Sequence, residues 1–154
     1  MLVTTGKKPD AASRSIAQAL FLSVPGATME NRGSRPLSAL ISKAKKRRFT
    51  RLCTIYREEG RPSTIAFLSL SDAGFEWLSP KIEITKVAAL PPKKRMQQAT
   101  ELRIKGAKAK ALQKLIEPLN QSGGQAATIT AGARKLTIHL GRKKILELGV
   151  EYAK

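Results

Sequence analysis

The feature that most constrains the fold of this chain is a series of elements that occurs twice, about 100 residues apart. In the first copy, the apolar residues 1–5 predict a strand, the loop 6–10 carries two lysines, and Ile16 and Leu20 mark the buried face of a helix. In the second copy, ELRIKG predicts a strand that ends in glycine and lysine, and a helix follows Gly106. Glycines end both helices, and a strand follows each one. We therefore predict a duplicated α/β unit.

The remaining segments have their own periodicity. Between the copies we expect a short strand over 27–30, a helix with Leu37, Leu40, Ile41 and Ala44 on one face, and antiparallel strands over 52–57, 64–70 and 81–87. In the second copy the helix face is Ala111, Leu112, Leu115, Ile116 and Leu119, and the strands are AATIT, KLTIHL and KILELG. We predict one domain over 1–154, with an N-terminal half over about 1–90, a proline-containing connector over about 91–98 and a C-terminal half over about 99–154.

The charge of the chain indicates a polyanionic partner. The sequence has 29 Lys and Arg residues against 11 Asp and Glu residues, which gives a net charge of +18. A field of this size favours RNA or DNA. No apolar run reaches the roughly 20 residues of a membrane span, no signal peptide is recognisable, and the lone Cys53 fits a reducing compartment. We therefore expect a cytoplasmic protein that has no membrane partner and is monomeric on its own.

Basic residues gather in three parts of the sequence. The densest is KAKKRRFTR, which holds six basic residues in nine at the expected end of the second helix. A solvated helix end explains part of this charge, because cations there stabilise the macrodipole, and hairpin lysines elsewhere can protect a sheet edge. Phosphate contact explains the rest. With Arg32, the predicted RNA contacts are Lys7, Lys8 and Arg14 in the opening loop, Lys43, Lys45, Lys46, Arg47, Arg48 and Arg51 in the dense cluster, and Arg134, Lys135, Arg142, Lys143 and Lys144 near the C-terminus.

The sequence offers little for catalysis. Its single histidine, His139, alternates with apolar residues in KLTIHL and has no evident orienting partner, and Glu58 and Glu59 fall at a predicted hairpin tip. No Walker or dinucleotide-binding glycine pattern is present, and one Cys and one His cannot form a tetrahedral zinc site. We therefore expect no enzymatic activity, no cofactor and no metal. Since the chain has seven aromatic residues, we expect recognition of phosphate and RNA shape more than base stacking.

The opening of the chain also carries a family resemblance. TTGKKPDAASRSIAQAL contains a threonine pair, a basic loop with proline and a helix start with serine and arginine, and an Asn-Arg-Gly turn follows before the next helix. The residues concerned are Thr4, Thr5, Lys8, Pro9, Ser13, Arg14, Asn31, Arg32, Gly33 and Leu37. This order resembles archaeal Brix-domain proteins, densely over 1–45 and loosely beyond. It departs near the end, where larger relatives carry Gly-Pro-Arg-Phe and this chain has Gly132, Ala133, Arg134 and Lys135.

The resemblance implies both a fold and a function. The fold is a pseudo-duplicated α/β (α+β) Brix domain, whose halves are each similar to the anticodon-binding domain of class II aminoacyl-tRNA synthetases. The function is that of a non-catalytic ribosome biogenesis factor, which binds precursor ribosomal RNA during rRNA processing and small-subunit assembly, with other assembly proteins as partners. Charge alone leaves an alternative open, namely a structural ribosomal protein or a general nucleic-acid-coating protein.

Overall fold

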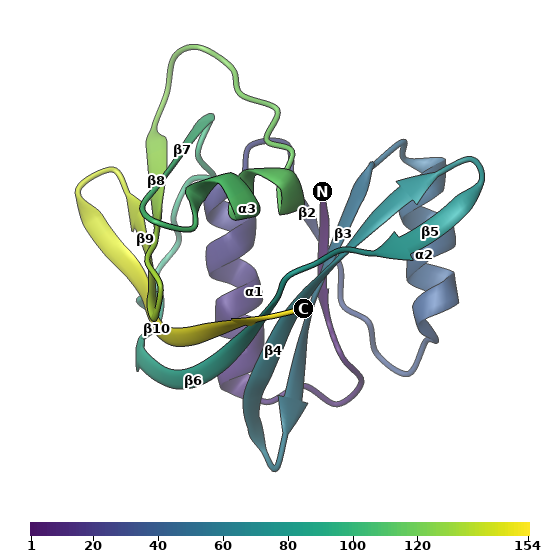
Figure 1. Cartoon of the computed structure of the whole chain (residues 1–154). Helices are drawn as coiled ribbons and strands as arrows, with labels where there is room; N and C mark the ends of the chain where they lie inside the picture. Colours follow the sequence, from purple (N-terminus) through teal and green to yellow (C-terminus); the bar gives the residue numbers. More distant parts are fainter.

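Strands are the most abundant regular element of the chain and join into one strongly twisted sheet (Figure 1). The computed structural model describes residues 1–154. The N-terminal half contains β1 (Leu2–Thr5), α1 (Ala11–Ser23), β2 (Thr28–Met29), α2 (Leu37–Lys46), β3 (Arg51–Glu58), β4 (Arg61–Ser71), β5 (Gly74–Trp77) and β6 (Lys81–Ala89). The C-terminal half contains β7 (Glu101–Lys105), α3 (Ala109–Leu115), β8 (Ala126–Ala131), β9 (Lys135–Leu140) and β10 (Lys143–Ala153). The predicted mixed α+β class is confirmed.

The strand order shows the predicted repeat. It runs β2-β1-β3-β4-β6-β10-β9-β8-β7, with β5 paired to β4. From β1 to β7 this order is symmetric about the antiparallel β6–β10 pair, because parallel β1–β3 matches parallel β7–β8, and antiparallel β3–β4 matches antiparallel β8–β9. The strand that follows α3 therefore corresponds to β3. We expected it to correspond to the strand near 27–30, which is instead part of an addition, β2 and α2, to the first unit.

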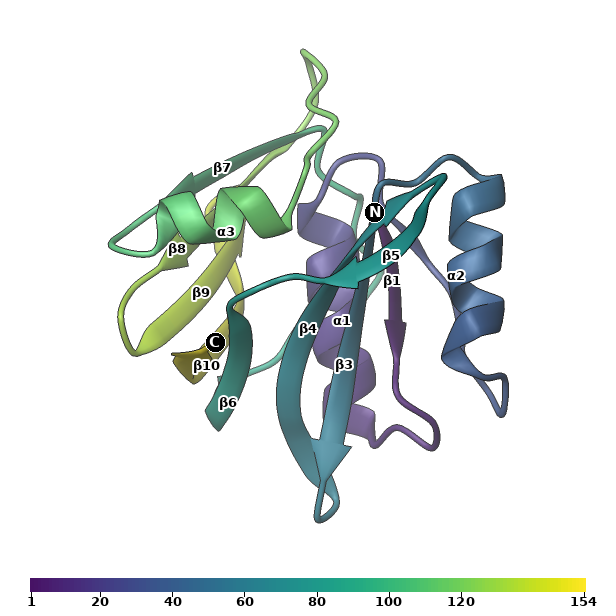
Figure 2. The same cartoon turned by 45° about the vertical axis from the view of Figure 1, so that its right-hand side comes forward.

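Helix α1 lies between the two halves of the sheet (Figure 2). It packs on β1, β3 and β4 of one half and on β8, β9 and β10 of the other. Its buried residues therefore include Ala19 and Leu22 as well as the predicted Ile16 and Leu20. A helix that packs on two sheets buries more than one stripe of its surface, which explains why a single amphipathic face describes it incompletely.

Helix α2 covers the other face of the N-terminal half-sheet. Leu40, Ile41 and Ala44 pack there on residues that include Leu2 and Leu68 in a small separate core. Adjacent strand residues alternate between the two cores, because successive side chains point to opposite faces of a sheet. The short apolar run at the start of the chain is thus buried on both sides, as expected for a parallel strand. No helix of the structure has the length and apolar content that a membrane crossing would require.

Three segments differ from the sequence prediction. Strand β5 was not expected, and it forms a hairpin with β4. Helix α3 ends at Leu115 and does not continue to Leu119. Pro118 disfavours a helical conformation of the residue before it and has no amide hydrogen to donate. The end of the connector also docks onto the fold. Gln98 Nε2 lies within 3.0 Å of three carbonyl oxygens at the end of α1, those of Phe21, Val24 and Ala27.

Candidate nucleic-acid interface

The end of α2 fixes the backbone of the densest basic cluster. The amide of Phe49 donates to the carbonyl of Ala44 (3.0 Å), and the amide of Arg48 donates to the carbonyl of Lys45 (3.0 Å). These two bonds define a Schellman motif, whose first residue after the helix cap adopts a left-handed conformation and is usually glycine. Here that residue is Arg48, with φ of 62°. Phe49 packs on the small core and anchors the turn.

Glu30 neutralises one side of this cluster. Its carboxylate lies 2.7 Å from Lys43 Nζ, 3.2 Å from Arg35 Nη2 and 3.9 Å from Arg47 Nη1. The hydrogen bond from Lys43 is the main cause of a pKa of Glu30 below its ordinary value, and Arg35 adds to the effect. The pairing therefore stabilises the fold at neutral pH, and this contribution is lost as the pH falls through that lowered pKa.

Lys45, Lys46 and Arg48 remain without a carboxylate partner. They are the part of the cluster that is free to meet an external anion, and we call them the α2 cluster. Lys45 and Arg48 line a shallow hollow between the end of α2 and the β4–β5 hairpin, together with Leu70.

Arg51 belongs to the same sequence run but connects the two halves of the protein. Its Nη2 lies 2.5 Å from Glu117 and 3.2 Å from the carbonyl of Lys114 at the end of α3. The hydroxyl of Thr50 donates to the same carboxylate. The side chain of Arg51 is 14% exposed. The sequence predicts Arg51 as a phosphate contact, whereas in the structure its side chain bridges β3 and the end of α3.

The opening loop presents its lysines to solvent. Lys7 and Lys8 are exposed, and Lys8 has φ of 50°. The predicted cap is confirmed, since the Asp10 carboxylate accepts from the amide of Ser13 (3.1 Å). Arg14 is exposed and donates to the carbonyl of Pro9 at 3.3 Å. The two lysines are thus accessible to an anion, whereas the carboxylate of Asp10 already occupies the helix N-terminus.

Arg32 lies inside the fold. It is 8% exposed, and its Nε donates to the carbonyl of Arg35, while the Nε of Arg35 donates back to the carbonyl of Arg32. This reciprocal pair closes the turn before α2. The RNA contact predicted at Arg32 stays a prediction, and the structure leaves it little room, since a buried guanidinium that holds a turn has little surface left for phosphate.

The outer face of the C-terminal half-sheet forms a second basic surface. Helices cover its inner face, where residues such as Ile129 and Ile138 are buried, and the outer face is left open. Strand register places Thr128 between Arg103 and His139, with Lys144 beyond. The predicted position of His139 on a polar strand face is confirmed. Arg103 and Lys105 are not among the predicted RNA contacts, although their alternation with apolar residues in ELRIKG indicates an exposed strand face.

The turns at the edge of this half-sheet add further charge. Arg134 and Lys135 lead into β9, Arg142 lies in the β9–β10 turn and Lys143 begins β10, and all four are exposed. Glu147 pairs with Lys144 (2.7 Å) and lies 4.0 Å from Lys135. The connector contributes Lys94, which lies against Lys143 and lowers the pKa of Lys143. Two ammonium groups held together without a carboxylate form a site of unbalanced positive charge.

The predicted basic groups do not meet on one surface. The parallel register of β1 and β3 places the opening loop beside Ile55, past the middle of β3, while the α2 cluster precedes Arg51 at the start of that strand. Arg51 and Ile55 are roughly 14 Å apart along the strand. The C-terminal half-sheet faces away from α2, and the two lie on opposite sides in Figure 1. The charge is therefore distributed over several separate patches.

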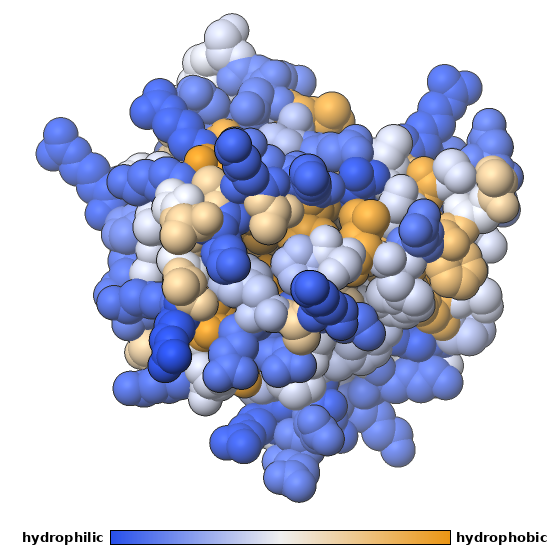
Figure 3. All heavy atoms as spheres, viewed as in Figure 1, coloured by the Kyte–Doolittle hydropathy of each residue, from blue (hydrophilic) through white to orange (hydrophobic).

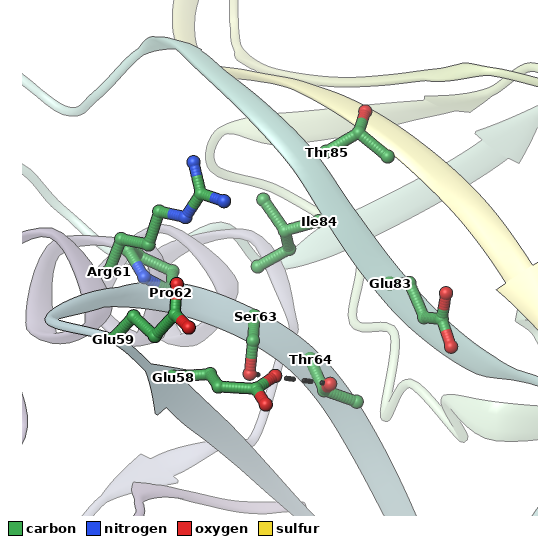
Figure 4. Close-up of a pocket in the computed structure, with 9 residues that line it drawn as sticks. All are labelled: Glu58, Glu59, Arg61, Pro62, Ser63, Thr64, Glu83, Ile84 and Thr85. Carbon is green, nitrogen blue, oxygen red and sulfur yellow. Dashed lines mark hydrogen bonds between the residues drawn. The ribbon is translucent and has the colours of Figure 1, made fainter.

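One hollow interrupts this positive surface with negative charge. It opens where β4 and β6 part below their short pairing, and Glu58, Glu59 and Glu83 line it with Arg61 (Figure 4). The predicted hairpin-tip position of Glu58 and Glu59 is confirmed. Carboxylates here repel phosphate, so this end of the sheet is an unfavourable place for RNA.

Cys53 and His139, the side chains best suited to nucleophilic or acid–base chemistry, lie on different strands, β3 and β9. No cluster of three or more His, Cys, Asp or Glu side chains is arranged to hold a metal ion. Cys53 is buried in β3, as predicted, and burial raises the pKa of its thiol. His139 has no hydrogen-bonded carboxylate.

The mirrored sheet, the sandwiched α1 and the exposed cations define a class of basic α+β proteins. Two solved structures share the fold. A probable ribosomal biogenesis protein from Aeropyrum pernix K1 has a TM-score of 0.74 and 17% identity, covering 99% of this chain and 94% of that chain. Mil, an archaeal Imp4-like protein, has a TM-score of 0.67 and 20% identity, covering 98% of this chain and 97% of its own. No protein-family model and no curated protein sequence matches the chain.

At 17 to 20% identity, this likeness establishes a shared fold over the whole chain. The predicted resemblance to archaeal ribosome biogenesis proteins is confirmed at that level. The likeness of each half to an anticodon-binding domain stays a prediction.

Proposed function

We propose that this protein is a non-catalytic ribosome biogenesis factor of the Brix type that binds precursor ribosomal RNA. The observation that carries the proposal is the excess of free cations, since seven of the 29 Lys and Arg side chains pair with a carboxylate and the others do not. Phosphate neutralisation by such side chains provides affinity through release of counterions. The printed names of the two structural neighbours support the biological setting.

The separate patches suggest how the protein acts. A single compact patch would hold one short RNA segment, whereas the α2 cluster and the C-terminal sheet face lie on opposite sides of the molecule. We propose that the protein contacts two RNA segments at once and keeps them close during rRNA processing and small-subunit assembly. It does so as a cytoplasmic monomer, with other assembly proteins as further partners.

The test is the salt dependence of binding to a precursor rRNA fragment, measured by fluorescence anisotropy. If ~6 to 8 phosphates are neutralised, the logarithm of the affinity falls against the logarithm of salt concentration with a slope of roughly −4 to −7. Replacing Lys45, Lys46 and Arg48 by Gln lowers the size of this slope by roughly 2 to 3. A flat salt dependence of the unmodified protein contradicts the proposal.

A matched control removes the same charge elsewhere. Arg57 and Arg61 in the β3–β4 hairpin and Lys86 on β6 are exposed and form no ion pair, so their triple Gln variant changes the slope less. Equal loss in both triple variants favours the alternative, a general nucleic-acid-coating protein. Recovery of the protein with mature translating subunits, and not with precursor particles, favours a structural ribosomal protein.

A further inference from the structure

The β4–β5 hairpin carries two aromatic side chains that the fold leaves exposed. Phe75 is 53% exposed and Trp77 is 40% exposed. They are two residues apart on β5, so both point to the same face of the strand. Their cross-strand partners, Leu70 and Leu68, are buried in the small core under α2. The two rings thus continue that core into solvent, and apolar atoms are visible over this end of the molecule in Figure 3.

One ring has a cation over it, and two further cations lie beside the strand partner of the other ring. Lys81 Nζ lies 5.5 Å from the centroid of the Trp77 ring. At the other end of β5, Lys45 and Arg48 line the hollow that contains Leu70, the cross-strand partner of Phe75. One carboxylate, that of Asp72, also lines this hollow. The aromatic pair therefore lies between positive charges near both ends of β5, which suits an RNA strand whose bases meet the rings and whose phosphates reach the cations at either end.

The spacing of the rings selects the form of nucleic acid. Residues two apart on a strand are separated by roughly 6.8 Å. Bases in a continuous stack are about 3.4 Å apart, so a regular duplex cannot place neighbouring bases on both rings. An unpaired strand can, because its bases can separate and stack on aromatic side chains.

We propose that Phe75 and Trp77 form a base-stacking platform for an unpaired RNA segment, whose phosphates contact Lys81 on one side and Lys45 and Arg48 on the other. The platform rests on the proposed RNA-binding function and adds to it a preference for single-stranded RNA. The small number of aromatic residues suggested little base stacking. Folding nevertheless places two of the seven on one exposed strand face beside the α2 cluster.

A protein partner is the competing occupant of this surface. An apolar hairpin edge can add a strand from another chain. The nearby charge favours RNA, since Lys81 lies over the Trp77 ring, and Lys45 and Arg48 share with a single carboxylate, Asp72, the hollow beside the strand partner of Phe75. Protein binding at this surface is the alternative result that the titration of Trp77 can show.

Trp77 is the only tryptophan of the chain, so its fluorescence reports directly on the platform. The full-length protein is titrated with a 12-nucleotide oligouridine RNA and, separately, with a 12-base-pair RNA duplex. We expect the single strand to quench Trp77 emission and to protect it from acrylamide, and the duplex to bind without either effect. Affinity is measured in parallel by anisotropy of labelled RNA, which does not depend on the tryptophan.

Phe75→Leu and Trp77→Leu keep apolar bulk and remove the aromatic plane. Each is expected to weaken single-strand binding by roughly 5- to 100-fold, as loss of one stacked base does, and to leave duplex binding unchanged. Leu90→Ala is the matched control, because Leu90 is an exposed apolar residue that follows β6 at the end opposite to Lys81. It is expected to change neither affinity.

The outcomes separate this proposal from the proposed function. Unchanged single-strand affinity in both leucine variants overturns the platform, while salt-dependent RNA binding would still support the proposed function. Absence of binding to either RNA overturns both. Absence of Trp77 quenching by the single strand, together with protection of Trp77 by a purified assembly protein, overturns the platform in favour of a protein interface.

Discussion

Two of the predicted contacts are basic residues in a backbone conformation that favours glycine. Arg48 has φ of 62° and Lys8 has φ of 50°. A residue with a Cβ atom in this region costs about 1 kcal/mol, and such costs are concentrated at functional sites. A glycine at the end of α2 would serve the fold better, so the presence of an arginine there suggests that its charge has a use.

We predict that Arg48→Gly stabilises the fold and weakens RNA binding. Relief of the left-handed strain should raise the free energy of unfolding by about 1 kcal/mol, measured by urea denaturation. Loss of the guanidinium should lower RNA affinity in the anisotropy assay. Arg48→Ala is the control, because it removes the same charge and keeps the strain. It should weaken binding equally without the gain in stability, and an equal stability of the two variants would refute the strain argument.

At the scale of elements, the connector is a structural part of the fold. Its Gln98 side chain meets three carbonyl groups at the end of α1, and the amide of Ala99 donates to the carbonyl of Leu22 (2.7 Å). The last carbonyl groups of a helix have no partner within the helix and need one elsewhere. Because α1 lies between both halves of the sheet, its end has little access to water.

Gln98→Ala should therefore lower the free energy of unfolding by about 1 to 3 kcal/mol, the cost of leaving partly buried carbonyl groups without a donor. Its neighbour Gln97 is exposed and provides the control, since Gln97→Ala should change stability by less than about 0.5 kcal/mol. Both are measured by urea denaturation at neutral pH. Equal stabilities would show that the connector is a passive linker, as the sequence suggested.

The sequence predicted elements where local signals were strong. Apolar residues at helical spacing identified α1 and α2, and alternating apolar residues identified β3, β4 and β6. A buried face gives the apolar residues of a helix or strand a regular spacing in the sequence. Strand β5 was missed, since it follows β4 at once and its two aromatic side chains are exposed, so that burial leaves no apolar period there. The pairing of Glu30 with Lys43 was also out of reach, because it joins residues 13 positions apart through tertiary contact.

At the scale of the whole molecule, the sequence indicated a repeat but not how the copies join. The two units meet through β6 and β10, whose register runs from Ala89–Glu147 to Lys81–Ala153. One core of 29 buried residues includes side chains of both halves, such as Phe67 and Ile138. Neither the seam nor the shared core leaves a periodic signal, since both depend on contacts between residues far apart in the chain.

This shared core predicts that the two halves unfold together. The amides of β3 and of β9 should lose their protection from hydrogen exchange at the same urea concentration. The change in Trp77 fluorescence should have its midpoint at that concentration too, because coincident transitions define a two-state process.

A substitution at the seam should affect both halves. Leu148 is buried on β10 and pairs with Val87 of β6, so Leu148→Ala should lower the free energy of unfolding by about 2 to 4 kcal/mol in both halves. Earlier loss of protection in β9 than in β3 would show instead that the halves are independent units, and that the protein could change the distance between two bound RNA segments.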